Sequence, residues 1–506
     1  MIDELFLEVK HVSKSYAGVR ALDDVEIAIR AGEIHCLVGE NGSGKSTLIK
    51  IIAGVVRADS GDIIINGKLY TNLHAIDAIR DGIQIIYQDL SLFPNLTVAE
   101  NISLNQEIER NSKFINLKEM REIAKNALAE IGEKLDLDER VENISVAKKQ
   151  LIAISRALTQ DAKLIIMDEP TSSLTKDEID RLFSVITGLK NRGISTLFVS
   201  HKLSEVFQIS ECVTVLRDGK LVGSYKTGEL DNDKLVFLMT GKKIETVPFE
   251  YDAGEKKPHP LLQVKNLNKE KQFRDVSFEL RKGEILGITG LLGSGRTELA
   301  LSLFGLNKAD EGEIRVEGKP VKIDSTEDAI NAGISYLPED RLNQGLFINQ
   351  PISNNIIITI IKKILNRLGL ISKEQKEKSV KKLVADLSIK TPTIEAPAQS
   401  LSGGNQQRVV LAKWLATDPK IFILDGPTIG VDIASKSTIH GIIRDLAKQG
   451  MGIILISDEI PEVLQNCNRI LVMSRGRVIE EIEDTTSISD DDLFNIVSGK
   501  ELNEAV

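Results

Sequence analysis

A glycine-rich segment near the start of the chain combines the residue types that bind phosphate groups. Glycines let backbone amides approach phosphate oxygens without obstruction by a Cβ atom, and the start of a helix adds the positive end of its dipole. A lysine in such a loop reaches the terminal phosphates, and the serine after it can bind Mg²⁺. We therefore expect a phosphate-binding loop. It consists of Gly39, Glu40, Asn41, Gly42, Ser43, Gly44, Lys45, Ser46 and Thr47.

The alternative is a glycine-rich turn that contains a lysine by chance. The neighbouring residues favour the phosphate loop. Residues 34–38 form a short apolar run that predicts a buried strand, and Leu48, Ile51 and Ile52 follow at helical spacing. A glycine-rich loop between a strand and a helix is the arrangement in which this motif binds phosphate.

A second apolar run supplies the carboxylates that phosphate chemistry requires. Residues 164–167 predict another buried strand, which ends at Asp168 and Glu169. Asp168 is placed to enter the coordination shell of Mg²⁺, and Glu169 to orient or deprotonate a water molecule. Such a run is a weak signal by itself, but together with the phosphate loop it is strong.

The chain contains the same pattern twice, which indicates a duplicated domain. The segment at 32–39 is repeated at 283–290, an offset of 251 (283 − 32). Further along, Asp168 corresponds to Asp425, an offset of 257 (425 − 168). We therefore expect domains at 1–245 and 261–506, joined by a linker at 246–260 that is rich in proline, glycine and charge.

Within each copy, runs rich in isoleucine and valine alternate with segments of helical period. This alternation predicts a largely parallel sheet covered by helices, an α/β fold. Residues 117–135 carry apolar side chains at helical spacing among charges, so we expect an amphipathic helix there, in a separate helical insertion.

Composition narrows the class of protein. The chain has 506 residues and a formal charge of −10, which argues against a nucleic-acid partner. No apolar run is long enough to span a bilayer, so a membrane role requires a partner chain. The acidic start lacks the features of a secretory signal, and we expect a cytosolic protein. Cys36, Cys212 and Cys467 fit neither a disulfide framework nor metal-ligand spacing in the sequence, and we expect reduced core residues.

A further segment carries a resemblance to a known family. Residues 401–407 read Leu-Ser-Gly-Gly-Asn-Gln-Gln, with Ser402 lying 23 residues (425 − 402) before Asp425, and this segment resembles the signature loop of ABC ATPases. Gln88, His201 and the loop at 172–175 extend the resemblance. It implies two tandem P-loop cassettes, each a RecA-like parallel sheet with an antiparallel β subdomain and a helical subdomain. It also implies ATP and Mg²⁺ as ligands, and a head-to-tail arrangement that places each ATP between one cassette's P-loop and the other's signature loop.

The resemblance assigns a complete first site. Glu169, His201 and Gln88 are implied as catalytic residues, and Ser46, Gln88 and Asp168 as metal ligands. Tyr16 is a candidate to stack on adenine, with a partly buried loop tyrosine as the alternative. The nucleotide would also contact the P-loop at 39–47 and, from the second cassette, Ser402, Gly403, Gly404 and Asp432.

The second site departs from the pattern at almost every role. Its P-loop comprises Gly290, Gly293, Ser294, Gly295, Arg296 and Thr297, so arginine replaces the lysine. The corresponding signature segment, Ser145 to Lys148, has Val146 and Ala147 in place of the two glycines. Gly426 stands for Glu169, Asp458 for His201, Glu339 for Gln88, and Thr175 for Asp432. We expect the first site to dominate hydrolysis, and the second to bind nucleotide or stay partly closed as a clamp.

A narrower resemblance concerns the transported substrate. Tandem cassettes, the arginine in the second P-loop and the segment 338–341 are similar to the ATPase subunits of bacterial monosaccharide importers of the ribose, galactose and xylose type. This implies integral-membrane permease subunits, two copies by expectation, an extracellular or periplasmic solute-binding protein, and a peripheral location on the cytoplasmic face of the membrane. The alternatives are a soluble tandem-cassette factor that acts on ribosomes, and a nucleotide switch with little turnover.

Overall fold

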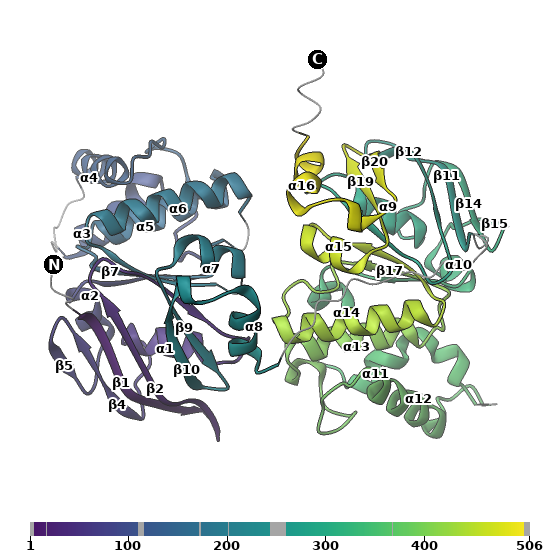
Figure 1. Ribbon diagram of the computed structural model, residues 1–506, viewed down its shortest axis with the longest axis horizontal. Helices are drawn as coiled ribbons and strands as arrows, with labels where there is room; N and C mark the ends of the chain where they lie inside the picture. Colours follow the sequence, from purple (N-terminus) through teal and green to yellow (C-terminus); the bar gives the residue numbers. More distant parts are fainter. Residues whose placement is uncertain are drawn as a thin grey trace, which may run out of the picture. The chain divides into compact units, whose positions relative to one another are not determined.

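The computed structural model describes residues 5–16, 18–109, 116–171, 174–200, 202–242, 260–366 and 368–499. The chain divides into two compact units, Met1–Ile244 and Glu245–Val506 (Figure 1). The expected linker at 246–260 lies outside the described residues apart from Pro260. No helix in the described ranges is both long and apolar enough to cross a membrane.

The first unit begins with an antiparallel sheet. Its strand order is β2-β1-β4-β5, and all of its pairings are antiparallel. Alternate side chains of β2 point into the core, as expected for a sheet with one buried face. The strands are β1 (Leu5–Tyr16), β2 (Val19–Arg30), β4 (Ser60–Ile65) and β5 (Lys68–Tyr70).

A largely parallel sheet forms the centre of the first unit, in the order β10-β9-β3-β8-β7-β6. Only β10 pairs antiparallel with its neighbour among the described strands. Every residue of β3 and β8 is buried, because helices cover both faces. The predicted strands at 34–38 and 164–167 are confirmed. The strands are β3 (Ile34–Val38), β6 (Ile83–Ile86), β7 (Leu164–Asp168), β8 (Ser195–Val199), β9 (Cys212–Arg217) and β10 (Lys220–Lys226).

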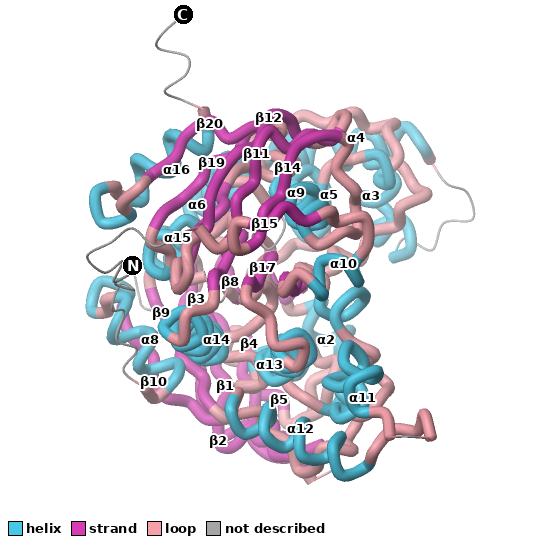
Figure 2. The backbone as a smooth tube through the Cα atoms, turned by 90° about the vertical axis from the view of Figure 1, so that its right-hand side faces the viewer, coloured by secondary structure: helices cyan, strands magenta, loops and turns pink. Residues whose placement is uncertain are grey.

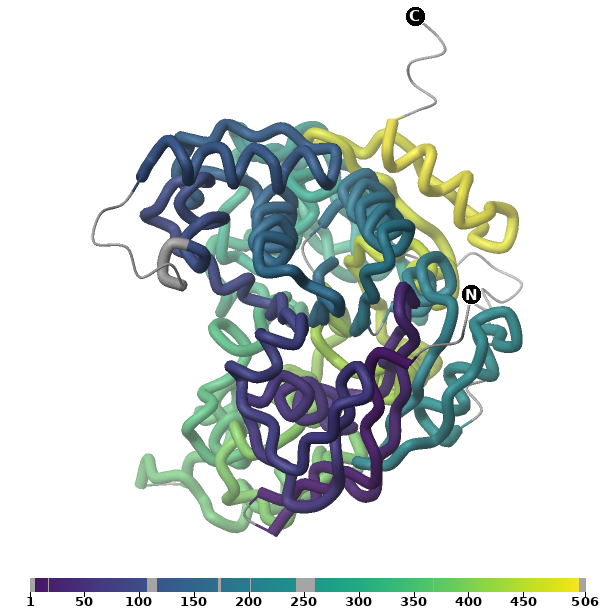
Figure 3. Tube along the Cα trace, turned by 90° about the vertical axis from the view of Figure 1, so that its left-hand side faces the viewer, coloured from purple at the N-terminus to yellow at the C-terminus, as the bar shows by residue number. Residues whose placement is uncertain are grey.

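Helices α3, α4 and α5 form a helical subdomain with its own apolar core, visible as the blue helices in Figure 3. Ile102, Ala124 and Ile152 lie in that core. The helices of the first unit are α1 (Lys45–Ile52), α2 (Ala75–Arg80), α3 (Val98–Glu109), α4 (Leu117–Glu130), α5 (Val146–Leu158), α6 (Lys176–Asn191), α7 (Leu203–Ile209) and α8 (Asn232–Thr240), with 3₁₀ turns at Val141–Asn143 and Thr227–Glu229.

The amphipathic helix predicted at 117–135 is confirmed, but its predicted end is wrong. Helix α4 stops at Glu130, because Gly132 adopts a left-handed backbone with φ 75°. The amide of Glu133 turns back to bond the carbonyl of Leu128, which closes the helix. Leu135 still packs against the subdomain core from the following loop.

The second unit repeats this architecture. An antiparallel sheet in the order β12-β11-β14-β15 precedes a sheet in the order β16-β17-β18-β13-β19-β20, in which β20 is the antiparallel member. The strands are β11 (Leu262–Lys269), β12 (Phe273–Leu280), β13 (Ile285–Thr289), β14 (Glu311–Val316), β15 (Lys319–Val321), β16 (Ile334–Leu337), β17 (Ile421–Asp425), β18 (Gly452–Ile456), β19 (Arg469–Ser474) and β20 (Arg477–Ile482). The expected α/β fold of tandem cassettes is confirmed.

The helices of the second unit follow the same succession. They are α9 (Arg296–Leu303), α10 (Thr326–Asn331), α11 (Ile352–Ile357), α12 (Lys373–Asp386), α13 (Gly403–Leu415), α14 (Ile433–Lys448), α15 (Ile460–Asn466) and α16 (Asp490–Ser498). A π turn spans Arg341–Gly345, and 3₁₀ turns lie at Ile358–Ile364, Ala398–Ser400 and Thr485–Ser487.

The first hairpin differs between the units. Figure 2 shows strands β11, β12 and β14 of the second unit side by side. Strands β1 and β2 have 12 residues each, whereas β11 and β12 have 8 each. As a result, the second unit has no strand extension equivalent to the one that carries Tyr16.

Candidate active site

The phosphate loop of the first unit connects β3 to α1, and two of its glycines are required by close backbone contacts. A Cβ atom on Gly39 would lie 2.3 Å from the carbonyl oxygen of Leu216. A Cβ atom on Gly44 would lie 2.6 Å from the carbonyl oxygen of Ala21. Gly44 also caps the amino end of α1 with φ 102°. The loop therefore brings backbone amides and a helix amino end together, as phosphate binding requires.

Lys45 lies across this loop. Its Nζ donates to the carbonyl oxygens of Gly39, at 2.7 Å, and Glu40, at 3.0 Å. Burial lowers the pKa of Lys45, while Glu169 and Asp168 raise it. The ammonium is thus held over the loop, where a phosphate could accept its hydrogen bonds. The buried hydroxyl of Ser43 has no hydrogen-bond partner within the described residues.

Asp168 ends β7, half-buried beside the loop. Burial raises its pKa, and so does repulsion from Glu169, whereas Lys45 and Lys50 lower it. A divalent cation relieves this kind of repulsion and prefers oxygen ligands. Asp168 and the exposed Ser46 therefore fit a magnesium nucleotide, in which the ion would screen phosphate charge.

Glu169 has an unusual backbone. Its φ is 48°, a left-handed conformation that non-glycine residues rarely adopt, and its amide donates to the carbonyl of Val199 at 3.0 Å. Such strain persists only where surrounding contacts impose it, and it is frequent at functional sites. The negative charge of the Glu169 carboxylate raises the pKa of Lys45, so this carboxylate acts on the phosphate loop.

Other predicted residues of the first unit lie as follows. Gln88 is exposed in the turn after β6. Tyr16 is the last residue of β1 and is 45% exposed, with the Lys14 Nζ 5.5 Å from the ring centroid. Its stacking on adenine and the alternative of a partly buried tyrosine both stay predictions. His201 lies outside the described residues, as do Ser172 and Ser173.

The signature segment of the second unit forms a tight turn at the start of α13. A Cβ atom on Gly404 would lie 2.0 Å from the Oγ of Ser435. Asp432, which caps α14, accepts hydrogen bonds from the amide of Ser435 at 2.8 Å and from its hydroxyl at 2.9 Å. Ser402 accepts a hydrogen bond from Asn405 at 3.0 Å. Ser402, Gly404 and Asp432 are thus brought together around a serine that the sequence interpretation missed.

Arg341 is a second residue that the interpretation did not place in this turn. A Cβ atom on Gly403 would lie 3.2 Å from the carbonyl oxygen of Gly430 and 3.3 Å from a guanidinium nitrogen of Arg341. The segment 338–341 had been singled out only for its family resemblance. Its arginine is packed against the backbone of the signature turn.

The corresponding segment of the first unit is built differently. Ser145 caps α5, and its hydroxyl accepts from the amide of Lys148 at 3.5 Å. Val146, 46% exposed, stands in place of the first glycine. Thr175, the counterpart of Asp432, caps α6 by a capping box with Glu178. The first unit therefore has a capped helix at this place but no aspartate.

In the second phosphate loop, Arg296 makes a different contact from Lys45. Its guanidinium donates to the carbonyl of Ser457, just after β18, at 3.0 Å. Burial lowers the pKa of Arg296, and the nearby carboxylates of Asp458 and Asp425 raise it. The longer planar side chain therefore bonds a neighbouring strand end instead of the carbonyls of its own loop.

Asp425, the counterpart of Asp168, is engaged by protein donors. Burial raises its pKa to about 6, and hydrogen bonds from Thr297 and Tyr336 lower it. The Tyr336 hydroxyl donates to the Asp425 carboxylate at 3.1 Å. Ile85 is the first-unit residue aligned with Tyr336 (336 − 251). The Asp425 carboxylate is thus hydrogen-bonded by side chains of its own unit.

Gly426 keeps the backbone of Glu169 without its carboxylate. Its φ is 55°, and its amide donates to the carbonyl of Ile456 at 2.9 Å. A Cβ atom there would lie 2.4 Å from the Cδ1 of Ile429. An isoleucine therefore occupies the space in which a side chain at 426 would begin.

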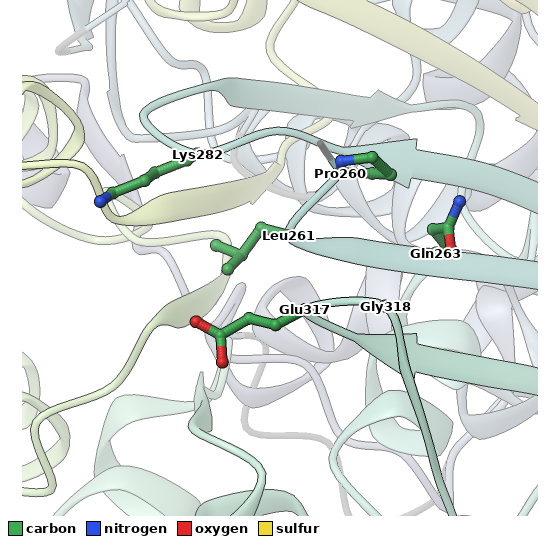
Figure 4. A pocket seen from close by; sticks show the side chains of 6 residues that line it. All are labelled: Pro260, Leu261, Gln263, Lys282, Glu317 and Gly318. Carbon is green, nitrogen blue, oxygen red and sulfur yellow. The ribbon is translucent and has the colours of Figure 1, made fainter. Parts of the chain in front are cut away.

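A separate pocket of about 450 Å³ lies in the second unit (Figure 4). None of its lining residues belongs to a phosphate loop or a signature turn. They are Pro260, Leu261, Gln263, Lys282, Glu317 and Gly318.

Two α/β units with a phosphate loop after a central strand, and a glycine signature turn in one of them, define a tandem cassette ATPase. Residues 22–172 and 273–429 match the family described as ABC transporter. The chain belongs to this ABC transporter family.

The curated relatives align over almost the whole chain. The ribose import ATP-binding protein RbsA of Clostridium perfringens (strain 13 / Type A) is 44% identical over 479 residues, which cover 94% of this chain and 95% of the relative. That of Caldanaerobacter subterraneus subsp. tengcongensis is 40% identical over 499 residues, covering 98% and 100%. A solved ATP-binding cassette of an ABC transporter in its ADP conformation is 26% identical, with a TM-score of 0.43, and covers 47% of this chain and 99% of its own.

Proposed function

We propose that this chain is the ATP-binding and ATP-hydrolysing subunit of an importer that takes up a monosaccharide, ribose being the first candidate, through a separate permease. The relatives named as ribose import ATP-binding proteins, aligned over 94% of the chain, carry this proposal. The full set of hydrolytic residue types in the first unit supports it. The ribosome-acting alternative is not favoured, because it predicts two complete sites.

We propose that hydrolysis takes place at the first unit's phosphate loop. Lys45 and the loop amides hold the β- and γ-phosphates. Ser46, Gln88 and Asp168 would hold Mg²⁺, which would neutralise developing phosphate charge. Glu169 orients the attacking water and accepts its proton as the bond to the γ-phosphorus forms and the bond to the leaving ADP oxygen breaks. His201 contacts the γ-phosphate, and Tyr16 stacks on adenine.

We further propose that the second cassette completes this site. Gly403 and Gly404 present backbone amides, and Ser402 a hydroxyl, to the γ-phosphate from the opposite side, while Asp432 buttresses that turn. Residues 1–245 and 261–506 act as the two cassettes and 246–260 as their linker. The second phosphate loop, at Gly290, Gly293, Ser294, Gly295, Arg296 and Thr297, binds nucleotide with little or no turnover.

The proposed partners are two integral-membrane permease subunits and, through them, an extracellular or periplasmic solute-binding protein. The proposed location is the cytoplasmic face of the membrane. ATP binding would close the cassettes on each other and hydrolysis would reopen them, which drives the permease between its states.

Native copurification followed by reconstitution into vesicles tests the proposal. We expect the complex to contain a permease and to accumulate labelled ribose only when ATP is supplied on the cassette side, and a Glu169→Gln complex to assemble but not transport. Recovery of the chain on ribosomes, with no permease, would contradict the importer. ATP-driven transport of another solute but not ribose would contradict only the substrate.

A further inference from the structure

Three potential metal ligands meet in the first unit, at the opposite end of β3 from the phosphate loop. They are the carboxylate of Glu33, the imidazole of His35 and the thiol of Cys212, and one ligand atom from each lies within 4.8 Å of the others. His35 pairs directly with Cys212 across the parallel strands β3 and β9. Both residues lie at the amino ends of these strands, whereas the phosphate loop follows the carboxyl end of β3.

The His35 ring is fixed from both sides. It is fully buried, with Nδ1 3.0 Å from the Glu33 carboxylate and Nε2 2.7 Å from the Thr214 hydroxyl. That hydroxyl lies 2.6 Å from the Ser224 hydroxyl. A metal-bound histidine usually has its second ring nitrogen held by such a polar partner, which sets the tautomer and the ring orientation. Nδ1 faces the carboxylate, and Nε2 is held in place.

The second unit has a buried carboxylate at the position of Glu33, and a cation neutralises it there. Glu284 aligns with Glu33 (284 − 251) and is 1% exposed. The guanidinium of Arg469 neutralises it, with Nε 2.9 Å from the carboxylate. Arg469 aligns with Cys212 (469 − 257).

The residue types therefore change together between the copies. Leu286 stands at the position of His35 (286 − 251), so the unit that has the arginine lacks the imidazole. The first unit has the opposite pair, an imidazole and a thiol beside the same carboxylate. Burying a carboxylate is unfavourable unless a cation or several donors compensate it. Imidazole, thiolate and carboxylate are together the ligand types of zinc-like ions.

We propose that Glu33, His35 and Cys212 bind a divalent transition-metal ion of the zinc type, which takes the place that the Arg469 guanidinium has in the second unit. The ion, one carboxylate, one thiolate and a neutral imidazole sum to zero charge. The other Glu33 carboxylate oxygen accepts from the Arg30 amide at 2.8 Å and lies 3.9 Å from the half-exposed Arg30 guanidinium. Bonds of about 2.0–2.3 Å in a tetrahedral site require small side-chain rotations to bring the three ligand atoms together. Cys212 is only partly buried, which gives solvent access for entry and for a water as fourth ligand.

Binding requires one proton to leave. A cysteine is ordinarily a thiol at neutral pH and binds a metal ion as the thiolate. The S–H bond breaks as the metal–sulfur bond forms, and the proton passes to solvent. The site is therefore expected to release one proton for each ion bound.

Cobalt(II) titration of the purified full-length chain, freed of metal by a chelator, tests this proposal, because a thiolate–cobalt bond absorbs in the near ultraviolet. We expect one such site per chain and displacement of the cobalt by Zn²⁺. Cys212→Ser should abolish the near-ultraviolet band, and Cys467→Ser, which changes a buried cysteine of the second unit, should leave it unchanged. Absence of the band in the unaltered chain, or its persistence in Cys212→Ser, would overturn the proposal.

A second pair of variants separates metal binding from folding. His35→Leu, the residue of the second copy, should remove the ligand. Thr214→Val should keep the ligand set but weaken cobalt binding about 10- to 100-fold through loss of ring orientation. The melting temperature of the unaltered chain should rise on adding Zn²⁺, and that of Cys212→Ser should not. Equal zinc shifts in both chains would contradict the site.

Discussion

The two cassettes keep the same backbone at the end of their central strand and differ in what that backbone presents. Glu169 and Gly426 share a left-handed φ, 48° and 55°, and each amide bonds the last residue of the neighbouring strand. One copy carries a carboxylate there, and the other fills the space with Ile429. The turn is therefore common to both units, whereas the carboxylate that we propose for hydrolysis is present only in the first.

The aspartate before this turn also differs between the units in its surroundings. Asp168 faces Lys45 and Lys50, while Asp425 accepts hydrogen bonds from Tyr336 and Thr297. An aspartate that faces solvent and lysine side chains can coordinate a metal ion. An aspartate that accepts hydrogen bonds from neighbouring side chains is instead part of the internal hydrogen bonding of its unit. In the second unit, internal contacts thus stand where the first unit has the groups that we propose for hydrolysis, while the strands are the same.

The largest expected effect comes from Glu169. Glu169→Gln should lower the ATPase kcat by about 10² to 10⁴, because it removes the proposed general base. That corresponds to roughly 3–5 kcal/mol of barrier. A steady-state phosphate-release assay on the assembled complex measures it. The matched control is Gly426→Glu, which should not raise the rate, since Ile429 blocks the side chain; a rate increase would break the comparison.

The second-largest effect on the ATPase kcat is expected in the signature turn. Gly404→Ala should lower kcat by about 10² to 10³, as expected for loss of aligned donors to the phosphate. Its Cβ would lie 2.0 Å from the Ser435 hydroxyl and would force the turn open. The control is Ala147→Gly at the corresponding place in the first unit, which should change the rate less than about twofold. Equal losses from both variants would show that both signature segments act in hydrolysis.

A third prediction concerns pH and stability. The folded pKa of Asp425 is raised from 3.8 to about 6, so its share of stability is complete below the unfolded pKa and is lost as the pH rises through about 6. Asp425→Asn should remove this loss and stabilise the second unit by up to about 3 kcal/mol at pH 7.5.

Urea unfolding followed by tryptophan fluorescence measures this effect in the second unit alone. Trp414 is the chain's one tryptophan, and its ring packs edge-on against Phe304, with centroids 5.2 Å apart. The exposed Asp386→Asn at the end of α12 is the control and should change nothing. If Asp425→Asn raises the free energy of unfolding over that of the unaltered chain no more at pH 7.5 than at pH 4, the ionised Asp425 does not destabilise the second unit.

The smallest effect is expected at Tyr16. Tyr16→Ala should raise the KM for ATP about 2- to 10-fold with kcat unchanged, the range expected for one lost aromatic contact. Tyr16→Phe should behave as the unaltered chain, because the ring and not the hydroxyl makes the stack. Competition by GTP and ATP in the same assay sharpens the result, and an unchanged KM in Tyr16→Ala would remove this residue from the site.

The central strands and the amphipathic helix were predictable from the sequence, because apolar runs and helical periodicity directly reflect burial. The end of α4 was not, since it depends on a left-handed turn at Gly132. The left-handed backbone of Glu169 depends on its bond to β8, and the bond between Tyr336 and Asp425 depends on the pairing of β16 with β17. Such contacts join residues far apart in the chain and leave no local pattern.

The sequence does contain a signal for one residue of the signature turn, Ser435. Ser435 stands three residues after the helix cap Asp432, the spacing of a capping interaction. The sequence therefore contained the residue that positions Gly404 and Asp432. The Glu33, His35 and Cys212 cluster left no such signal, because Cys212 lies 177 residues (212 − 35) from His35 and joins it only through the sheet.

Vanadate-dependent photocleavage of the complex with Mg²⁺ and ATP tests most directly whether ATP is hydrolysed between the first unit's phosphate loop and the second unit's signature turn. Trapped vanadate occupies the position of the γ-phosphate, so light should cut the chain near Ser43 and near Ser402. Cuts near Ser294 and Ser145 instead would place hydrolysis at the other site and contradict this account.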